Sequence, residues 1–365
     1  MISIIGAGPV GNYCAYLLAK KGFKVNIFEE HPKAGIPVQC TGIVTKQLFK
    51  YVPKSKEFVI NHFNKVQTVA PNNDYAEIPL EEYLLDRTRF DNYLLNKAQD
   101  AGAEVHFNHK FIEFKDNKAV IKNKQRLIHN QADYFIGADG PLSKVAESAG
   151  LLKNRQFFVG MQARVRGNFS KHTFTTFFGN NIAPGFFAWV VPESSSTARA
   201  GLATRKNTGF YFQNLLNSLN FTPIEYQGGL IPIFNPKQKV KKDNIFLIGD
   251  AAGFTKATTG GGLVFGLESA KIVSKCIVKN KKYNKEIFRL KFSLQLHRII
   301  RNSLNEFKDY EHIKIIDLMK KKKIQNILKK NNREFPAGLL FKLILYELRL
   351  ARFLKYLIIS KKKDF

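Results

Sequence analysis

Acidic residues are scarce in this chain of 365 residues: 29 Asp and Glu stand against 58 Lys and Arg, a formal net charge of +29. Such a shortage of acids leaves the surface strongly positive. We therefore expect an anionic partner, such as phospholipid head groups, nucleic acid or a phosphorylated substrate. An AT-rich genome is an alternative source of the many lysines, although such a bias normally raises Glu as well.

Cysteine is also rare, and long apolar runs are missing. Cys14, Cys40 and Cys276 form no C-x-x-C pair and no metal-ligand spacing, so we expect a reducing, cytoplasmic location and no metal site. No stretch reaches the roughly 18 uncharged apolar residues that a membrane span needs. A strand is expected from residue 2, which leaves no room for a signal peptide.

The first eleven residues, MISIIGAGPVG, have the pattern of a dinucleotide-binding fold. An apolar run ending at Ile5 predicts a buried parallel strand, and a helical pattern follows the glycines. In this fingerprint Gly6 permits a tight turn, Gly8 lets the backbone approach a pyrophosphate, and Gly11 lets the helix pack closely on the strand. Glu29, at the end of the second expected strand, is placed to bind ribose hydroxyls. A glycine-rich turn in an unrelated α/β domain is the alternative.

Composition and periodicity predict an α/β fold in three parts. The first is a discontinuous Rossmann-like cofactor-binding domain over residues 1–60, 81–154 and 241–280. The second is an inserted antiparallel β-sheet domain for the substrate, rich in Phe, Thr and Val, over residues 61–80 and 155–240. The third is a basic, helical C-terminal region over residues 281–365.

Three small-residue turns follow expected strands: the one at Gly6, GADG around Asp139, and GDAAG around Asp250. The carboxyl ends of strands are where open α/β sheets bind ligands. Together the turns resemble the FAD-binding signature of the glutathione-reductase-type flavoproteins, which include the aromatic hydroxylases. The resemblance implies FAD as cofactor, with Asp250 bonded to its ribityl chain or pyrophosphate. It also implies that N–H groups for the flavin come from a helix start at Gly260, Gly261 and Gly262.

Two more residues of this signature have alternative interpretations. Arg87, in RTRFDNYL, matches the family arginine that approaches the FAD, or it is a solvated charge at a helix start. Asp139 belongs to the FAD site, or it is a plain turn aspartate.

Other segments resemble a narrower family, the archaeal-type geranylgeranyl reductases, over about residues 1–270. GIPVQCTG (35–42) resembles its PVQCxG segment, and KATTGGG (256–262) resembles its flavin turn. PGFFAWVVP (184–192) resembles its substrate-cavity motif, with Phe187 in place of a tyrosine and the single tryptophan, Trp189, retained. These two rings are the expected substrate contacts. A polyprenyl chain needs an aromatic-lined apolar tunnel, although an ordinary sandwich core explains most rings in this region.

The narrower resemblance implies an FAD-dependent reductase that saturates isoprenoid C=C bonds of prenylated glycerophospholipids or prenyl diphosphates. Cys40 would lie beside the flavin, where a neutral thiol in a dry cavity is a suitable proton donor; a small packing residue is the alternative. A single dinucleotide fingerprint indicates one tightly held cofactor, so a transient NAD(P)H or a redox protein must deliver electrons.

Two other functions stay open at this point. One is an FAD-dependent monooxygenase of the aromatic-hydroxylase type, disfavoured because Ala146 and Glu147 stand where hydroxylases tend to carry an arginine. The other is a basic flavoprotein that binds nucleic acid, disfavoured because no nucleic-acid module is recognisable.

The C-terminal segment predicts an amphipathic helix. Its apolar stripe comprises Leu339, Leu343, Tyr346, Leu350, Phe353 and Leu357. Because Lys342, Arg349, Arg352 and Lys355 fall on the other side and Lys361, Lys362 and Lys363 follow, we expect this helix to lie on an anionic membrane surface, which makes the protein peripheral to the membrane. A helix packed on the protein's own core is the alternative.

Overall fold

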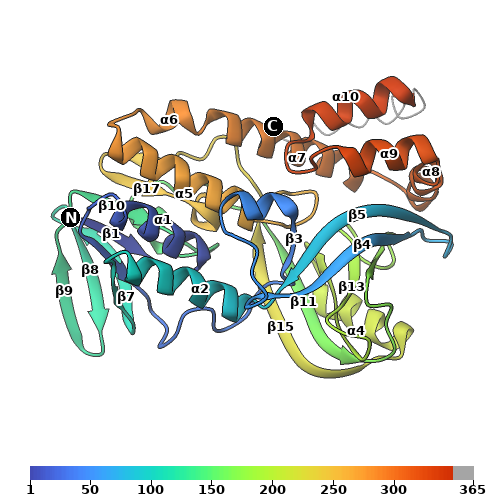
Figure 1. The fold of residues 1–365 in the computed structure, drawn as a ribbon, viewed down its shortest axis with the longest axis horizontal. Helices are drawn as coiled ribbons and strands as arrows, with labels where there is room; N and C mark the ends of the chain where they lie inside the picture. The colour runs from blue at the N-terminus through green and yellow to red at the C-terminus, as the bar shows by residue number, and fades with distance from the viewer. Residues whose placement is uncertain (348–365) are drawn as a thin grey trace.

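The computed structural model describes residues 1–347. Figure 1 shows an α/β body of the Rossmann-like kind on the left, a large β-sheet on the right, and C-terminal helices along the top of both. The three-part α/β architecture expected from the sequence is therefore present.

The α/β body is built on a six-stranded sheet. Its spatial order is β16 (Lys241–Lys242), β17 (Ile245–Leu247), β10 (Tyr134–Gly137), β1 (Ile2–Ile5), β2 (Val25–Phe28) and β6 (Glu104–His106). All neighbours pair in parallel except β16 and β17. β1 is buried throughout because helices cover one face and a meander covers the other, which explains its continuous apolar run.

Two layers cover this sheet. The helices on one side are α1 (Pro9–Ala19), α2 (Arg87–Asp100) and α5 (Leu263–Val278). The other side carries α3 (Lys144–Ser148) and the meander β7 (His109–Lys115), β8 (Lys118–Asn123) and β9 (Arg126–Asn130). Phe114 of the meander packs on Phe135 of β10 with ring centroids 5.1 Å apart.

The second body is an eight-stranded sheet. Its order is β15 (Thr222–Pro232), β11 (Phe157–Arg166), β14 (Thr197–Thr204), β13 (Ala188–Pro192), β12 (Thr173–Phe177), β4 (Val59–Val69), β5 (Tyr75–Leu85) and β3 (Ile43–Thr45). The helix α4 (Thr208–Leu219) packs on its outer face. Within the described chain, the strands pair antiparallel as expected, except that β12 and β4 run parallel. The β4–β5 hairpin runs from Val59 to Leu85, beyond the expected 61–80 at both ends.

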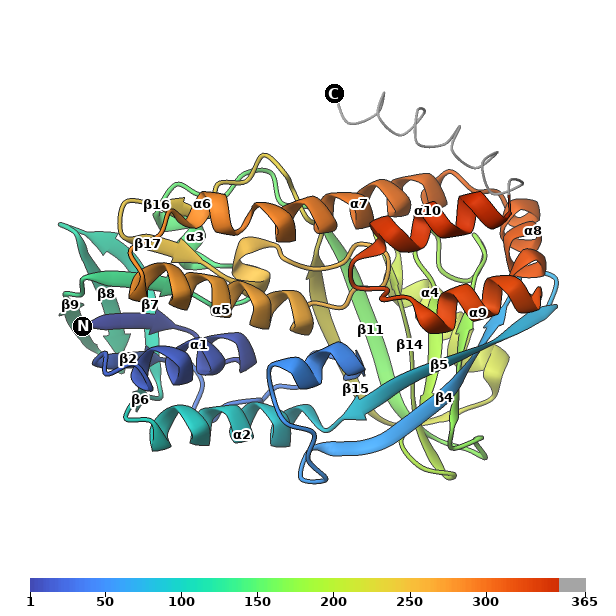
Figure 2. The same cartoon turned by 45° about the horizontal axis from the view of Figure 1, so that its top comes forward.

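Up to residue 347, where the description ends, the C-terminal region forms five helices: α6 (Tyr283–Glu286), α7 (Phe288–Asn305), α8 (Asp309–Met319), α9 (Lys322–Lys330) and α10 (Pro336–Tyr346). In both views α7 extends from the α/β body towards the large sheet, and α8 and α9 pack against β5 (Figure 2). Within residues 1–347 no helix is long and apolar enough to cross a membrane. The predicted C-terminal stripe is only partly visible, because Leu350, Phe353 and Leu357 lie outside the described residues.

Candidate active site

The glycine turn after β1 leaves a cradle at the start of α1. Gly6 has φ +105°, and a Cβ there would lie 2.5 Å from the Ala138 carbonyl oxygen. A Cβ on Gly11 would lie 2.1 Å from the Gly6 carbonyl oxygen. Gly8 differs: apart from its chain neighbours, no heavy atom of residues 1–347 lies within 4 Å of a Cβ built on it. The open space at Gly8 and the backbone N–H groups of the helix start suit a pyrophosphate.

Glu29 lies beside this cradle at the end of β2. Its Oε2 accepts from the Ala7 N–H at 2.8 Å, and its Oε1 accepts from the His31 N–H at 3.0 Å. The buried carboxylate is thus fixed against the turn, at the position that the sequence predicts for ribose binding.

Asp139 holds the second turn in shape. Its Oδ2 accepts from the Val145 N–H at 3.0 Å and so caps the start of α3, and its Oδ1 accepts from the hydroxyl of the N-cap residue Ser143 at 2.6 Å. This geometry favours the turn-aspartate interpretation. The turn still borders the cradle, because the Ala138 N–H donates to the Ile5 carbonyl at 2.8 Å.

Asp250 lies at the third turn, before α5. The Thr255 hydroxyl donates to its Oδ1 at 3.1 Å, and a Cβ on Gly262 would approach that oxygen to 2.8 Å. Burial raises the pKa of Asp250. Arg155, which sequence reasoning missed, braces the turn by donating to the Ala251 and Pro141 carbonyls, both at 2.7 Å.

Arg87 is not a solvated charge, since its side chain is 16% exposed. It forms a bidentate pair with Asp91, with both N–O distances 3.0 Å, and it lies near enough to Cys40 for the two side chains to interact electrostatically. Burial opposes its charge, but Asp91 and Cys40 together raise the pKa of Arg87. The guanidinium is therefore firmly cationic beside the thiol.

A cavity of about 520 Å³ lies between the eight-stranded sheet, the 256–264 turn and the C-terminal helices. This falls within the roughly 300–1,000 Å³ typical of ligand pockets. Its wall is mostly apolar and includes Val66, Ile78, Leu80, Phe174, Phe178, Phe186, Phe187, Trp189, Ile231, Met319, Leu328, Leu339 and Leu340. Gly260, Gly261, Gly262 and Cys40 line it too, so the cavity joins the predicted flavin turn to the predicted substrate segment.

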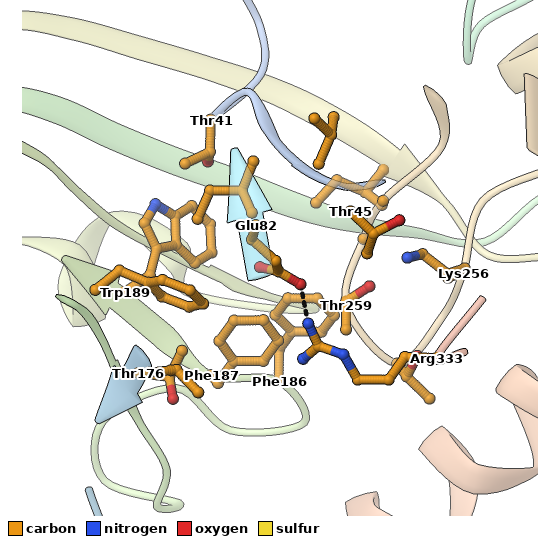
Figure 3. A pocket seen from close by; sticks show the side chains of 18 of the residues that line it. Thr41, Thr45, Glu82, Thr176, Phe186, Phe187, Trp189, Lys256, Thr259 and Arg333 are labelled. Atoms are coloured by element: carbon orange, nitrogen blue, oxygen red, sulfur yellow. Dashed lines mark hydrogen bonds and ion pairs between the residues drawn. The ribbon is translucent and has the colours of Figure 1, made fainter. Parts of the chain in front are cut away.

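Phe187 and Trp189 meet in this cavity, with ring centroids 6.0 Å apart, and Phe187 stacks on Phe186 at 4.5 Å (Figure 3). Phe187 immediately precedes β13, and Trp189 belongs to it. The Trp189 Nε1–H donates to Gln162 Oε1 at 3.3 Å, and the Thr41 hydroxyl donates to the same oxygen at 2.7 Å. Gln162 thereby fixes the tryptophan relative to the Cys40 loop.

A second set of buried interactions, centred on Arg199, holds the Cys40 loop in place. Arg199 pairs with Glu193 at 2.7 Å and donates to the Thr41 and Leu85 carbonyls. The Gly42 N–H lies 3.3 Å from Cys40 Sγ. These bonds keep the half-buried thiol at the cavity wall.

The C-terminal region contributes a polar wall that no sequence motif indicated. Glu334, 1% exposed, accepts from the Thr45 hydroxyl at 2.8 Å and pairs with Lys256 at 2.7 Å. Burial opposes the charge of Glu334, but Lys256, the Thr45 hydroxyl and His297 together lower its pKa. Arg333 pairs with Glu82 across the cavity (Figure 3).

Two residues of α7 attach to the flavin turn. The His297 ring nitrogens lie 2.8 Å from the Thr258 hydroxyl and 3.0 Å from the Glu334 carbonyl, and burial lowers the pKa of His297 to about 4. Arg301, 3% exposed, donates to the Ala257 carbonyl at 2.9 Å and lies 4.6 Å above the Phe186 ring. Burial lowers the pKa of Arg301 to about 9. Arg301 therefore links the flavin turn to the aromatic wall.

Comparisons with known proteins bear on both halves of this site. The model described as "NAD(P)-binding Rossmann-like domain" matches residues 4–52, and the model described as "FAD binding domain" matches residues 50–207. The digeranylgeranylglycerophospholipid reductase of Methanocaldococcus jannaschii is 30% identical over 315 residues, which cover 76% of this chain and 78% of that protein. A reductase of the same name, numbered 2, from Methanothermobacter thermautotrophicus is 29% identical over 293 residues, 74% of this chain and 76% of that one.

Solved structures show the same fold. A geranylgeranyl bacteriochlorophyll reductase-like protein from Thermoplasma acidophilum superposes with a TM-score of 0.86 at 22% identity, covering 98% of each chain. A flavin-dependent brominase superposes with a TM-score of 0.68 at 15% identity, covering 95% of this chain and 99% of that one.

Proposed function

Because this chain belongs to the digeranylgeranylglycerophospholipid reductase family of FAD-dependent oxidoreductases, we propose that it saturates isoprenoid C=C bonds of a prenylated glycerophospholipid or a prenyl diphosphate. The observation that carries this proposal is one cavity that the predicted flavin turn and the predicted substrate segment both line. One apolar, aromatic-walled space reaches the glycine turn that would hold the flavin. A flexible hydrocarbon chain is the ligand that such a wall suits.

Saturating a C=C bond adds a hydride to one carbon and a proton to the other. Reduced FAD, when bound, supplies the hydride. We assign the proton to the Cys40 thiol, which lines the cavity. Loss of that proton leaves a thiolate against the Arg87 guanidinium, and the thiolate recovers a proton from solvent. The cradle residues Gly6, Gly8, Gly11 and Glu29 would hold the adenosine and pyrophosphate half.

The proposed partners follow from charge and from the single cofactor cradle. The net charge of +29 supports attachment to an anionic membrane surface. One dinucleotide-binding turn supports a transient electron donor, either NAD(P)H or a redox protein. The likeness to a flavin-dependent brominase and to a probable FAD-dependent monooxygenase, at 15% and 13% identity, concerns the fold alone.

The test is anaerobic reduction of a defined lipid. Protein reduced with dithionite is mixed with a detergent-dispersed prenyl lipid, and flavin reoxidation and lipid mass are followed together. We expect the flavin to reoxidise only when lipid is added, and the lipid to gain two hydrogens per bond. A reduced flavin that stays reduced beside unchanged lipid would refute the proposal. Product carrying added oxygen, formed only in air, would instead identify a monooxygenase.

A further inference from the structure

The helix α10 has apolar residues on two opposite faces. Pro336, Leu339 and Leu340 line the cavity, and Leu339 is only 9% exposed. On the opposite side, Phe341 is 69% exposed and Leu345 is 61% exposed. Of the predicted stripe, Leu339 faces the cavity and Tyr346 is 56% exposed, whereas Phe341 and Leu345 are exposed without belonging to the stripe.

A helix that is apolar on both sides needs an apolar environment on both. The cavity provides one of them. Beside the exposed face, α9 packs against α10 and presents four exposed lysines: Lys322, Lys323, Lys329 and Lys330. Lys342 on α10 is exposed too, and Lys323 lies 5.8 Å above the Tyr346 ring. Large apolar side chains bordered by cations complement the acyl region and head groups of an anionic bilayer.

We propose that α10 docks the protein on an anionic lipid bilayer, with Phe341 and Leu345 inserted below the head groups. The same helix closes the cavity on its inner side, so the lipid substrate passes from the bilayer into the cavity beside α10 without crossing water. The substrate part of this inference rests on the proposed function; the docking part does not.

The test compares two doubly substituted full-length proteins with the wild type. Phe341→Asp/Leu345→Asp places two charges on the proposed face. Phe210→Asp/Leu127→Asp is the matched control, because these side chains are 64% and 59% exposed on α4 and β9. Binding is measured by co-sedimentation with vesicles of phosphatidylglycerol and, separately, of phosphatidylcholine.

We expect the α10 variant to lose at least tenfold in affinity for phosphatidylglycerol vesicles, while the control variant binds like the wild type. FAD content and melting temperature should be unchanged in both. Unchanged vesicle binding by the α10 variant overturns the proposal. A large fall in melting temperature overturns it too, because the face would then be covered by the protein's own chain or by a second copy.

A second variant, Lys329→Glu/Lys330→Glu, tests the charge requirement without touching the apolar face. It should bind phosphatidylglycerol vesicles at least fivefold more weakly, and equal binding would contradict the proposal. Lipid reduction separates docking from catalysis. The α10 variant should reduce vesicle-embedded lipid at least tenfold more slowly and detergent-dispersed lipid within twofold of wild type. If the wild type reduces neither lipid, the proposed function fails and the vesicle data still decide the docking.

Discussion

The glycines of the cofactor cradle exclude larger side chains for different reasons. Gly11 is fixed by the protein itself, since a Cβ would overlap the Gly6 carbonyl oxygen at 2.1 Å. Around Gly8 the described chain leaves open space, so the need for glycine there comes from the ligand. The glycines of one motif can thus be separated by experiment into folding and binding positions.

We predict that Gly8→Leu folds with the melting temperature of the flavin-free wild type but retains less than about a tenth of its FAD, because the new side chain occupies the pyrophosphate space. Flavin absorbance per purified protein is the measurement. Gly11→Leu is the contrasting variant and should fail to yield folded protein. A Gly8→Leu protein with a full complement of FAD would disprove the cradle assignment.

Cys40 is the residue on which the proposed proton transfer depends. Cys40→Ala should keep its FAD and be reduced normally by dithionite, yet saturate lipid roughly 10²-fold more slowly, because a general acid contributes about 10²–10⁴-fold. Single-turnover flavin reoxidation measures this step. Cys276→Ala, at a buried packing position on α5, should react at the wild-type rate. An unchanged rate in Cys40→Ala would make that thiol a packing residue.

Among elements, the loop between α9 and α10 is attached to the flavin turn by the Glu334–Lys256 pair. Removing one member of a buried pair leaves an uncompensated charge, which costs about 3–5 kcal/mol, whereas an apolar replacement of both is often neutral. We predict that Glu334→Ala loses about that much unfolding free energy in urea and that Glu334→Leu/Lys256→Met recovers most of it. A loss below about 1 kcal/mol in the single variant would show that the pair is solvated.

The stability that α7 contributes through its contact with the flavin turn should depend on pH. Burial lowers the pKa of His297 to about 4 in the fold, against 6.5 when unfolded, so between these values the unfolded state binds more protons and stability falls as pH falls. From pH 7 to pH 5 this one group should remove about 2 kcal/mol.

Burial lowers the pKa of His312 as well, so the comparison is between the wild type and His297→Gln. Melting temperature from pH 5 to 7 should fall less steeply in the variant. Identical slopes would show that His297 is not held neutral.

Sequence predicted the elements that a local pattern defines. The β1 run, the glycine turns and the phenylalanine-rich sheet were predictable, because period and turn chemistry are local properties. The polar wall was not. Glu334 and Thr45 are 289 residues apart, and nothing near Arg301 in the sequence indicates that it bonds to the flavin turn. Similarly, the stripe starting at Leu339 has the right period, but periodicity cannot show which face of α10 meets the cavity.

At the scale of the whole molecule, the excess of bases lowers the stability of the folded state. With 58 bases and 29 acids, at least half of the bases have no acid to neutralise them, and their mutual repulsion opposes the compact state. Added salt shortens the range of this repulsion, from about 30 Å at 0.01 M to about 10 Å at 0.1 M. The same screening weakens attraction to an anionic bilayer. Added salt should therefore raise the melting temperature and lower the affinity for anionic vesicles.

We predict that raising NaCl from about 10 mM to about 200 mM increases the melting temperature of the flavin-loaded protein by about 1–2 °C, equivalent to about 1 kcal/mol. Over the same range its affinity for phosphatidylglycerol vesicles should fall at least tenfold. Sucrose at matched osmolality is the control, since it changes water activity without screening charge. If salt lowered the melting temperature instead, attractive ion pairs such as Lys65–Glu77 and Lys320–Asp74 would dominate over repulsion. The excess of bases would then cost the fold little stability, and the fall in vesicle affinity with salt would alone test its role in membrane attachment.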